Sequence, residues 1–66
     1  MEDLGWYKIN EDSWGRADVG MIERAGDVYE FIPVSHLIVR DRISRSTAEE
    51  VADAVEDWLE MYDPSY

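Results

Sequence analysis

The sequence predicts a small α+β domain, in which an antiparallel sheet of three to four strands is followed by one C-terminal amphipathic helix packed on one sheet face. Three observations support this fold. Residues 46–62 repeat apolar side chains at helical spacing. Residues 19–32 contain two short strand-like runs around a glycine turn. The chain has 66 residues, so residues 1–66 are expected to form a single domain, with the element order β-β-β-α.

The first strand is expected in residues 5–10, "GWYKIN", which are rich in aromatic and β-branched side chains. Residues 10–15, "NEDSWG", are expected to form a polar turn. Trp14 lies in this turn beside Gly15, so it is a candidate exposed anchor for a protein partner. The alternative is that Trp14 belongs to the core or covers it.

Residues 19–32 predict a hairpin whose arms are residues 19–24 and 28–32. Gly26 lies in the turn between the arms, because glycine accepts a positive φ. Pro33 is expected to end the second arm, since it has no N–H to donate to a neighbouring strand. Residues 35–41, "SHLIVRD", fit either a fourth strand or a connector to the helix.

The helix is expected to begin at a capping box formed by Ser46 and Glu49 and to end before Pro64. Its apolar stripe comprises Ala48, Val51, Ala52, Val55, Trp58, Leu59 and Tyr62. One helix covers one sheet face, yet residues 28–32 place apolar groups on both faces of their strand. We therefore expect an exposed apolar patch, which suits a partner or a homodimer contact. The alternative is that residues 35–41 or the N-terminal segment fold over it.

The residue types argue against an enzyme. The chain has no cysteine, one histidine, His36, and no spacing typical of a zinc site or a phosphate-binding loop. A short chain also leaves little room for a deep pocket. No catalytic residue, metal or cofactor is expected. Arg40, Arg42 and Arg45 are expected to pair with Asp41, Glu49 or other local acids.

The net charge is −10, from 16 acids and 6 bases. Such a surface repels nucleic acid and anionic lipid, so neither is expected as a partner. No apolar run is long enough to span a membrane. The absence of cysteine and of a secretory signal favours the cytoplasm. The expected partner is a basic protein.

The acids are concentrated in the helix. Residues 46–66 hold seven acids and no base, whereas residues 1–45 hold nine acids and six bases. Like charges three or four residues apart cost roughly 0.2–0.5 kcal/mol per pair. Their sum of ~2 kcal/mol is large beside the ~3–5 kcal/mol that a domain of this size supplies. We therefore expect a binding role for Glu49, Glu50, Asp53, Glu56, Asp57, Glu60 and Asp63.

Residues 49–63 span about 21 Å of helix, or one charge per ~3 Å, close to the ~3.4 Å between phosphates of one DNA strand. The helix is thus predicted to imitate phosphates in the basic channel of a nucleic-acid-binding protein. Asp53, Glu56 and Glu60 are expected on its outer face, free of packing contacts. The alternative for this face is an acidic surface that only solvates the fold.

Small size, the lack of catalytic motifs and the acidic helix make a profile that is similar to small phage-encoded inhibitors of bacterial defence, such as anti-CRISPR and anti-restriction proteins. This resemblance implies a non-enzymatic protein-binding inhibitor that acts in the host cytoplasm. Two other functions remain open. One is a structural or assembly adaptor that dimerises through its open sheet face. The other is an antitoxin-like neutraliser of a basic toxin.

Overall fold

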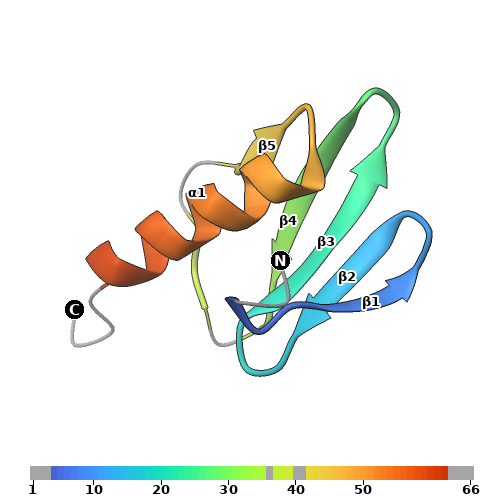
Figure 1. The fold of residues 1–66 in the computed structure, drawn as a ribbon. Coiled ribbons are helices and arrows are strands. Elements are labelled where there is room, and N and C mark those ends of the chain that lie inside the picture. The colour runs from blue at the N-terminus through green and yellow to red at the C-terminus, as the bar shows by residue number, and fades with distance from the viewer. Residues whose placement is uncertain (1–3, 36, 40–41, 63–66) are drawn as a thin grey trace.

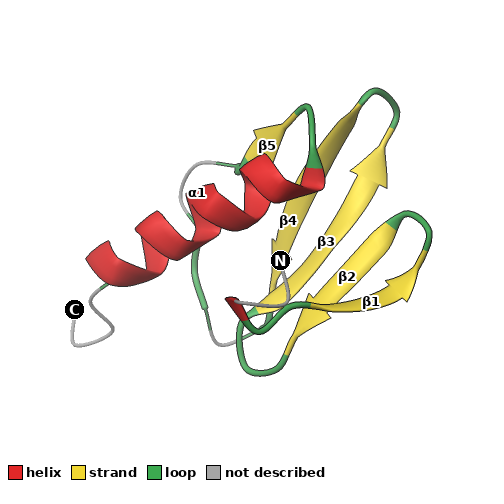
Figure 2. Ribbon diagram, in the orientation of Figure 1, coloured by secondary structure: helices red, strands yellow, loops and turns green. Residues whose placement is uncertain are grey.

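The computed structural model describes residues 4–35, 37–39 and 42–62 of the chain. The described residues form a five-stranded antiparallel sheet in which each strand pairs with the next along the chain, and one helix packed against it (Figures 1 and 2). The α+β fold is confirmed, with five strands in place of three to four. The elements are β1 Tyr7–Asn10, β2 Ser13–Arg16, β3 Gly20–Ala25, β4 Val28–Pro33, β5 Ser44–Arg45 and α1 Ala48–Met61.

The structure corrects the prediction of a turn at residues 10–15. Only Glu11 and Asp12 turn the chain, and the Asp12 N–H donates to Asn10 Oδ1 at 2.9 Å. Residues 13–16 form β2, in which Trp14 pairs with Ile22 of β3. The residues of β2 have weak strand preference. These residues form a strand because β1 and β3 pair with β2 on its two sides.

The predicted hairpin is confirmed as β3 and β4, which turn at Gly26 with φ 70°. Pro33 is the last residue of β4. Residues 35 and 37–39 are not strand, so the described part of "SHLIVRD" is a connector. His36, Arg40 and Asp41 lie outside the described residues. The additional strand β5 pairs with Tyr29 and Glu30 of β4. It has only two residues, so its sequence is too short to show the periodicity of a strand.

Helix α1 begins one residue later than predicted. Its N-cap is Thr47, whose hydroxyl accepts from the Glu50 N–H at 3.1 Å. The Glu50 carboxylate in turn accepts from the hydroxyls of Ser46 and Thr47, each at 3.1 Å. Both registers place Glu three residues after a hydroxyl side chain, so the sequence pattern alone does not choose between them. The helix ends at Met61, with Tyr62 as its C-cap.

The core lies between α1 and the helix-facing side of the sheet, mainly over β3 and β4 (Figure 1). Ile22 and Phe31 from the sheet share one buried cluster with Val51 and Val55 from the helix. Trp6 closes this cluster, with its ring centroid 6.3 Å from that of Phe31. The indole N–H of Trp6 is buried without a hydrogen-bond partner among the described residues, so apolar packing holds this side chain.

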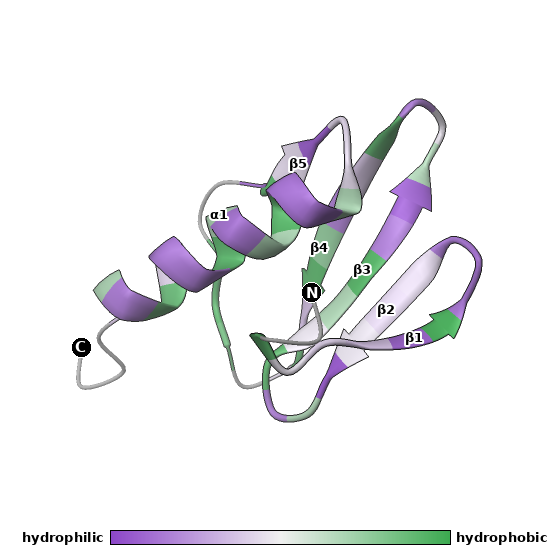
Figure 3. Ribbon diagram, in the orientation of Figure 1, coloured by the Kyte–Doolittle hydropathy of each residue, from purple (hydrophilic) through white to green (hydrophobic). Residues whose placement is uncertain are grey.

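The predicted apolar stripe of the helix is confirmed. Ala48, Val51, Ala52 and Val55 are buried, while Trp58, Leu59 and Tyr62 are half-buried. Figure 3 shows hydrophilic and hydrophobic bands alternating along α1, as a one-sided helix requires. The acidic residues are thereby directed mostly toward solvent.

Gly20 lies where the backbones of β3 and β4 approach each other closely. It has a φ of 153°, and a Cβ there would overlap the Ile32 carbonyl oxygen and lie 2.9 Å from Pro33 Cα. We predict that Gly20→Ala lowers the free energy of unfolding by at least ~2 kcal/mol, because backbone atoms must move. The control is Gly26→Ala, where nothing lies within 4 Å and only the positive φ of 70° is unfavourable, at about 1 kcal/mol. Urea titration followed by tryptophan fluorescence measures both, and equal losses would contradict the predicted close approach.

Candidate functional site

The outer side of α1 carries a continuous acidic face. The exposed acids on it, here called the acidic face, are Glu49, Glu50, Asp53, Asp57 and Glu60. They recur at intervals of three and four residues, which places them opposite the buried stripe. From Glu49 to Glu60 the face runs about 16 Å at 1.5 Å per residue. Asp63, the last acid predicted for this face, lies outside the described residues.

The acidic face is not neutralised from within the described part of the chain. The ion pairs there join Arg16 to Glu56, Arg24 to Asp12 and Arg42 to Glu30. None of the five exposed acids of α1 takes part in these ion pairs, and the last turn of the helix holds no base. The helix thus keeps its excess negative charge at the surface.

Arg42 and Arg45, the described arginines just before the helix, form no ion pair with its acids. Arg42 lies 3.4 Å from Glu30 on β4, rather than pairing with a neighbouring acid. The Nη1 of Arg45 donates to the Ser44 carbonyl at 2.7 Å. Strand β5, which contains Arg45, pairs with β4, so this segment is part of the sheet.

Glu56 differs from the other helix acids and corrects one expectation. Its Oε2 lies 2.8 Å from Nη1 of Arg16 on β2, and the two side chains are 36% and 25% exposed. The expectation that Glu56 has no contact with the rest of the fold is therefore wrong. An arginine 40 residues earlier in the chain reaches it because β2 directs Arg16 toward the helix. Glu56 fastens α1 to the sheet.

Two further predicted binding residues have structural contacts of their own. The Glu50 carboxylate caps its own helix through Ser46 and Thr47, although it remains exposed. Trp14 is half-buried on β2 instead of exposed in a turn. Its ring lies 5.9 Å from that of Tyr29, and Lys8 Nζ lies 5.9 Å from its centroid. A partner contact by Trp14 stays a prediction.

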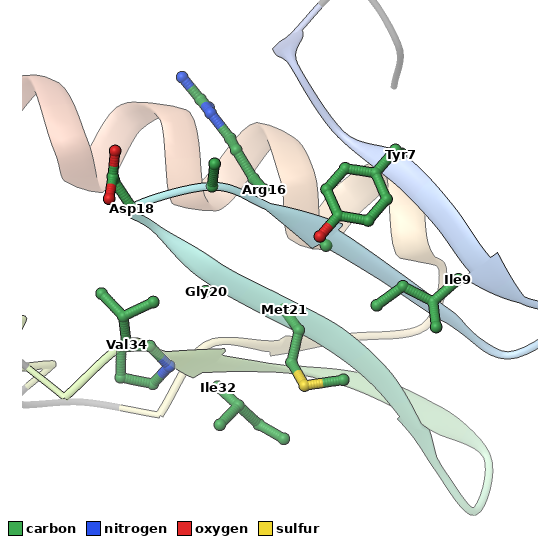
Figure 4. A pocket seen from close by; sticks show the side chains of 11 residues that line it. Tyr7, Ile9, Arg16, Asp18, Gly20, Met21, Ile32 and Val34 are labelled. Atoms are coloured by element: carbon green, nitrogen blue, oxygen red, sulfur yellow. The ribbon is translucent and has the colours of Figure 1, made fainter.

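The side of the sheet away from α1 is a second candidate surface, here called the open face. Tyr7, Ile9 and Ile32 are 57%, 49% and 41% exposed there, as the expected apolar patch requires. Their side chains surround an open hollow of about 350 Å³, together with Met21 and Val34 (Figure 4). Sequence reasoning anticipated the patch from β4 but missed the contribution of β1.

The described residues do not form a metal site. Among residues 4–35, 37–39 and 42–62, no three acidic or histidine side chains converge in a way that suits a metal ion. The described helix is too short and too polar to cross a bilayer.

Comparison of the chain with protein-family models, curated proteins and solved structures finds no match. The acidic face and the open face are therefore the features that indicate a function.

The Arg16–Glu56 pair allows a direct test of how the helix is fastened. A double-mutant cycle with Arg16→Gln and Glu56→Gln should give a coupling free energy of about 0.5–1 kcal/mol, because both groups are partly shielded from water. The matched cycle uses Arg24→Gln and Asp12→Asn, whose atoms are 3.6 Å apart and whose side chains are more than half exposed. Its coupling should stay below ~0.3 kcal/mol. Denaturation midpoints give both values, and an equal coupling in the two cycles would refute the role assigned to Glu56.

Proposed function

We propose that this protein is a non-enzymatic inhibitor that binds another protein through the acidic face of α1. The target is a basic nucleic-acid-binding protein, and the carboxylates take the positions of phosphates in its channel. The observation that supports this proposal is the set of five exposed helix acids without an ion-pair partner among the described residues. The same face would suit a basic toxin neutralised in an antitoxin-like manner.

The energetics of the helix favour a binding role. Within α1, six like-charge pairs at spacings of three or four residues involve Asp53 or Glu60. Each costs roughly 0.2–0.5 kcal/mol on a helix surface. Glu60 also lies in the last turn, where the helix dipole disfavours an acid. A basic partner removes these costs on binding, because its Lys and Arg side chains supply the missing opposite charge.

The dimensions of the face fit this partner. About 16 Å of helix carrying five exposed charges matches the length of four to five phosphates at the ~3.4 Å spacing of a DNA strand. A helix is also rigid, so the charges are arranged before binding and the backbone loses little conformational entropy on association. The proposed action is in the cytoplasm of a host cell, as the similarity in profile to phage anti-defence inhibitors implies.

A structural adaptor is the second candidate function. The exposure of Tyr7, Ile9 and Ile32 on the open face favours it, since exposed apolar patches mark protein contacts. The two functions respond differently to salt. Binding through the acidic face weakens steeply as ionic strength rises, whereas an apolar contact does not.

The double variant Asp53→Gln, Glu60→Gln tests the inhibitor. It relieves all six like-charge pairs without adding charge, so stability at low salt should rise by about 1 kcal/mol. Affinity for the captured target should fall at least ~tenfold, because two phosphate substitutes are lost. The target is captured from host lysate on the immobilised chain, identified, and its binding measured by calorimetry with and without competing duplex DNA.

The matched control is Glu11→Gln with Asp27→Asn. Both residues are exposed, lie in turns, and carry the same total charge as the helix pair. The control should bind the target as the parent chain does. If the helix variant is more stable and binds equally well, the acids only solvate the fold. Equal weakening by both double variants would show that net charge matters and the helix does not.

Direct nucleic-acid binding is predicted to be absent. A net charge of −10 repels the phosphate backbone, and the described arginines at positions 16, 24 and 42 are already paired with acids. A mobility-shift assay with short duplex and single-stranded DNA and RNA in moderate salt should show no complex. A complex at sub-micromolar protein would contradict the electrostatic argument.

A further inference from the structure

The strands separate their charges between the two faces of the sheet. The register places Lys8, Arg16, Arg24 and Arg45 on the side of Ile22 and Phe31, which faces α1. The acids of the strands, Glu23 and Glu30, occupy the opposite side. The open face therefore receives acids from the strands and no strand-borne base.

An apolar row crosses this face. Tyr7, Gly15, Met21 and Ile32 are paired in register across β1, β2, β3 and β4. The ring of Tyr7 lies over Gly15, where an added Cβ would be 3.0 Å from the ring and hydroxyl. Ile9 lies beside it, 3.1 Å from the same point. Glycine at this position lets the Tyr7 ring lie close against the sheet, where it lines the hollow in Figure 4.

An acidic row runs beside the apolar one. Ser13, Glu23, Glu30 and Ser44 are paired in register across β2, β3, β4 and β5. Residues on one face repeat every second position, so the two rows lie ~7 Å apart. Glu30 has Arg42 at 3.4 Å, whereas Glu23 is exposed and has no ion-pair partner in the described part of the chain.

We propose that the open face docks an extended segment of another protein that alternates apolar and basic side chains. Apolar side chains of this segment enter the hollow between Tyr7, Met21 and Ile32. Its Lys or Arg side chains reach Glu23, the acid of this row that has no ion-pair partner in the described part of the chain. Both requirements follow from charge and shape complementarity, since the row of acids lies one side-chain repeat from the row of apolar groups.

A second copy of this chain is a poorer occupant. Two copies bring together net charges of −10 each. The described bases beside this face, Arg16 at the hollow and Arg42 at Glu30, are already paired within the chain, so neither is free to meet Glu23 of the other copy. The proposed segment avoids this repulsion. This surface lies on the opposite side of the sheet from α1, so the inference stands independently of the function proposed for the acidic face.

The test uses the full chain labelled with ¹⁵N and three synthetic ten-residue peptides, which alternate Leu with Lys, Leu with Glu, or Ser with Lys. The Leu–Lys peptide should bind saturably and shift the amide resonances of Tyr7, Gly15, Met21 and Ile32. The other two peptides should leave these resonances in place. Absence of saturable binding by the Leu–Lys peptide up to ~1 mM, or shifts confined to residues 49–60, would overturn the proposal.

Variants separate the open face from the acidic face. Ile9→Thr with Ile32→Thr should weaken the Leu–Lys peptide at least ~tenfold, because both methyl-rich walls of the hollow are lost. The control Ile38→Thr removes an isoleucine that is 70% exposed in the connector, and it should bind as the parent does. Asp53→Gln with Glu60→Gln should also bind as the parent does, whatever its effect on the acidic-face target. Equal binding by the Ile9/Ile32 variant would refute the open-face site, as would a dimer of the free chain in sedimentation that this variant abolishes.

Discussion

The packing of one helix against one side of a thin sheet is the contact on which the rest of this structure depends. Val51 and Val55 share a buried cluster with Ile22 and Phe31, and each such side chain contributes roughly 1.5–3 kcal/mol by leaving water. The described chain has one helix for this purpose. The acids of α1 are therefore turned outward, and the far side of the sheet is left open. Both candidate surfaces are consequences of the same packing.

Electrostatics reinforce this arrangement. The strands direct Lys8, Arg16 and Arg24 toward the side where the acid-rich helix lies. Arg16 makes a short ion pair with Glu56, and the other bases make the electrostatic potential on this side of the sheet less negative. Apart from Glu56, the described acids of the helix and the strands lie on the two outward surfaces. These surfaces differ in chemistry, because one is almost wholly charged and the other combines an apolar row with acids.

Local patterns predicted much of the fold correctly. The helix, its apolar stripe and the hairpin around Gly26 follow from periodicity and from the conformational freedom of one residue. Each of these features depends on residues that are close together along the chain, so the sequence shows the pattern directly. The acidic face was predictable for the same reason, since residues on one side of a helix recur every three or four positions. The sequence predicts seven acids for this helix, and the structure describes six of them.

The sequence by itself determined that a helix with an acidic outer side follows a hairpin, because both are local. Only the tertiary structure decided which strands lie beside them. It made a strand of residues 13–16, paired the two residues of β5, and joined Glu56 to an arginine 40 positions away. It also aligned Tyr7, Met21 and Ile32 in one row. Each of these features depends on strand register, which is set by the burial of one shared core and not by any single segment.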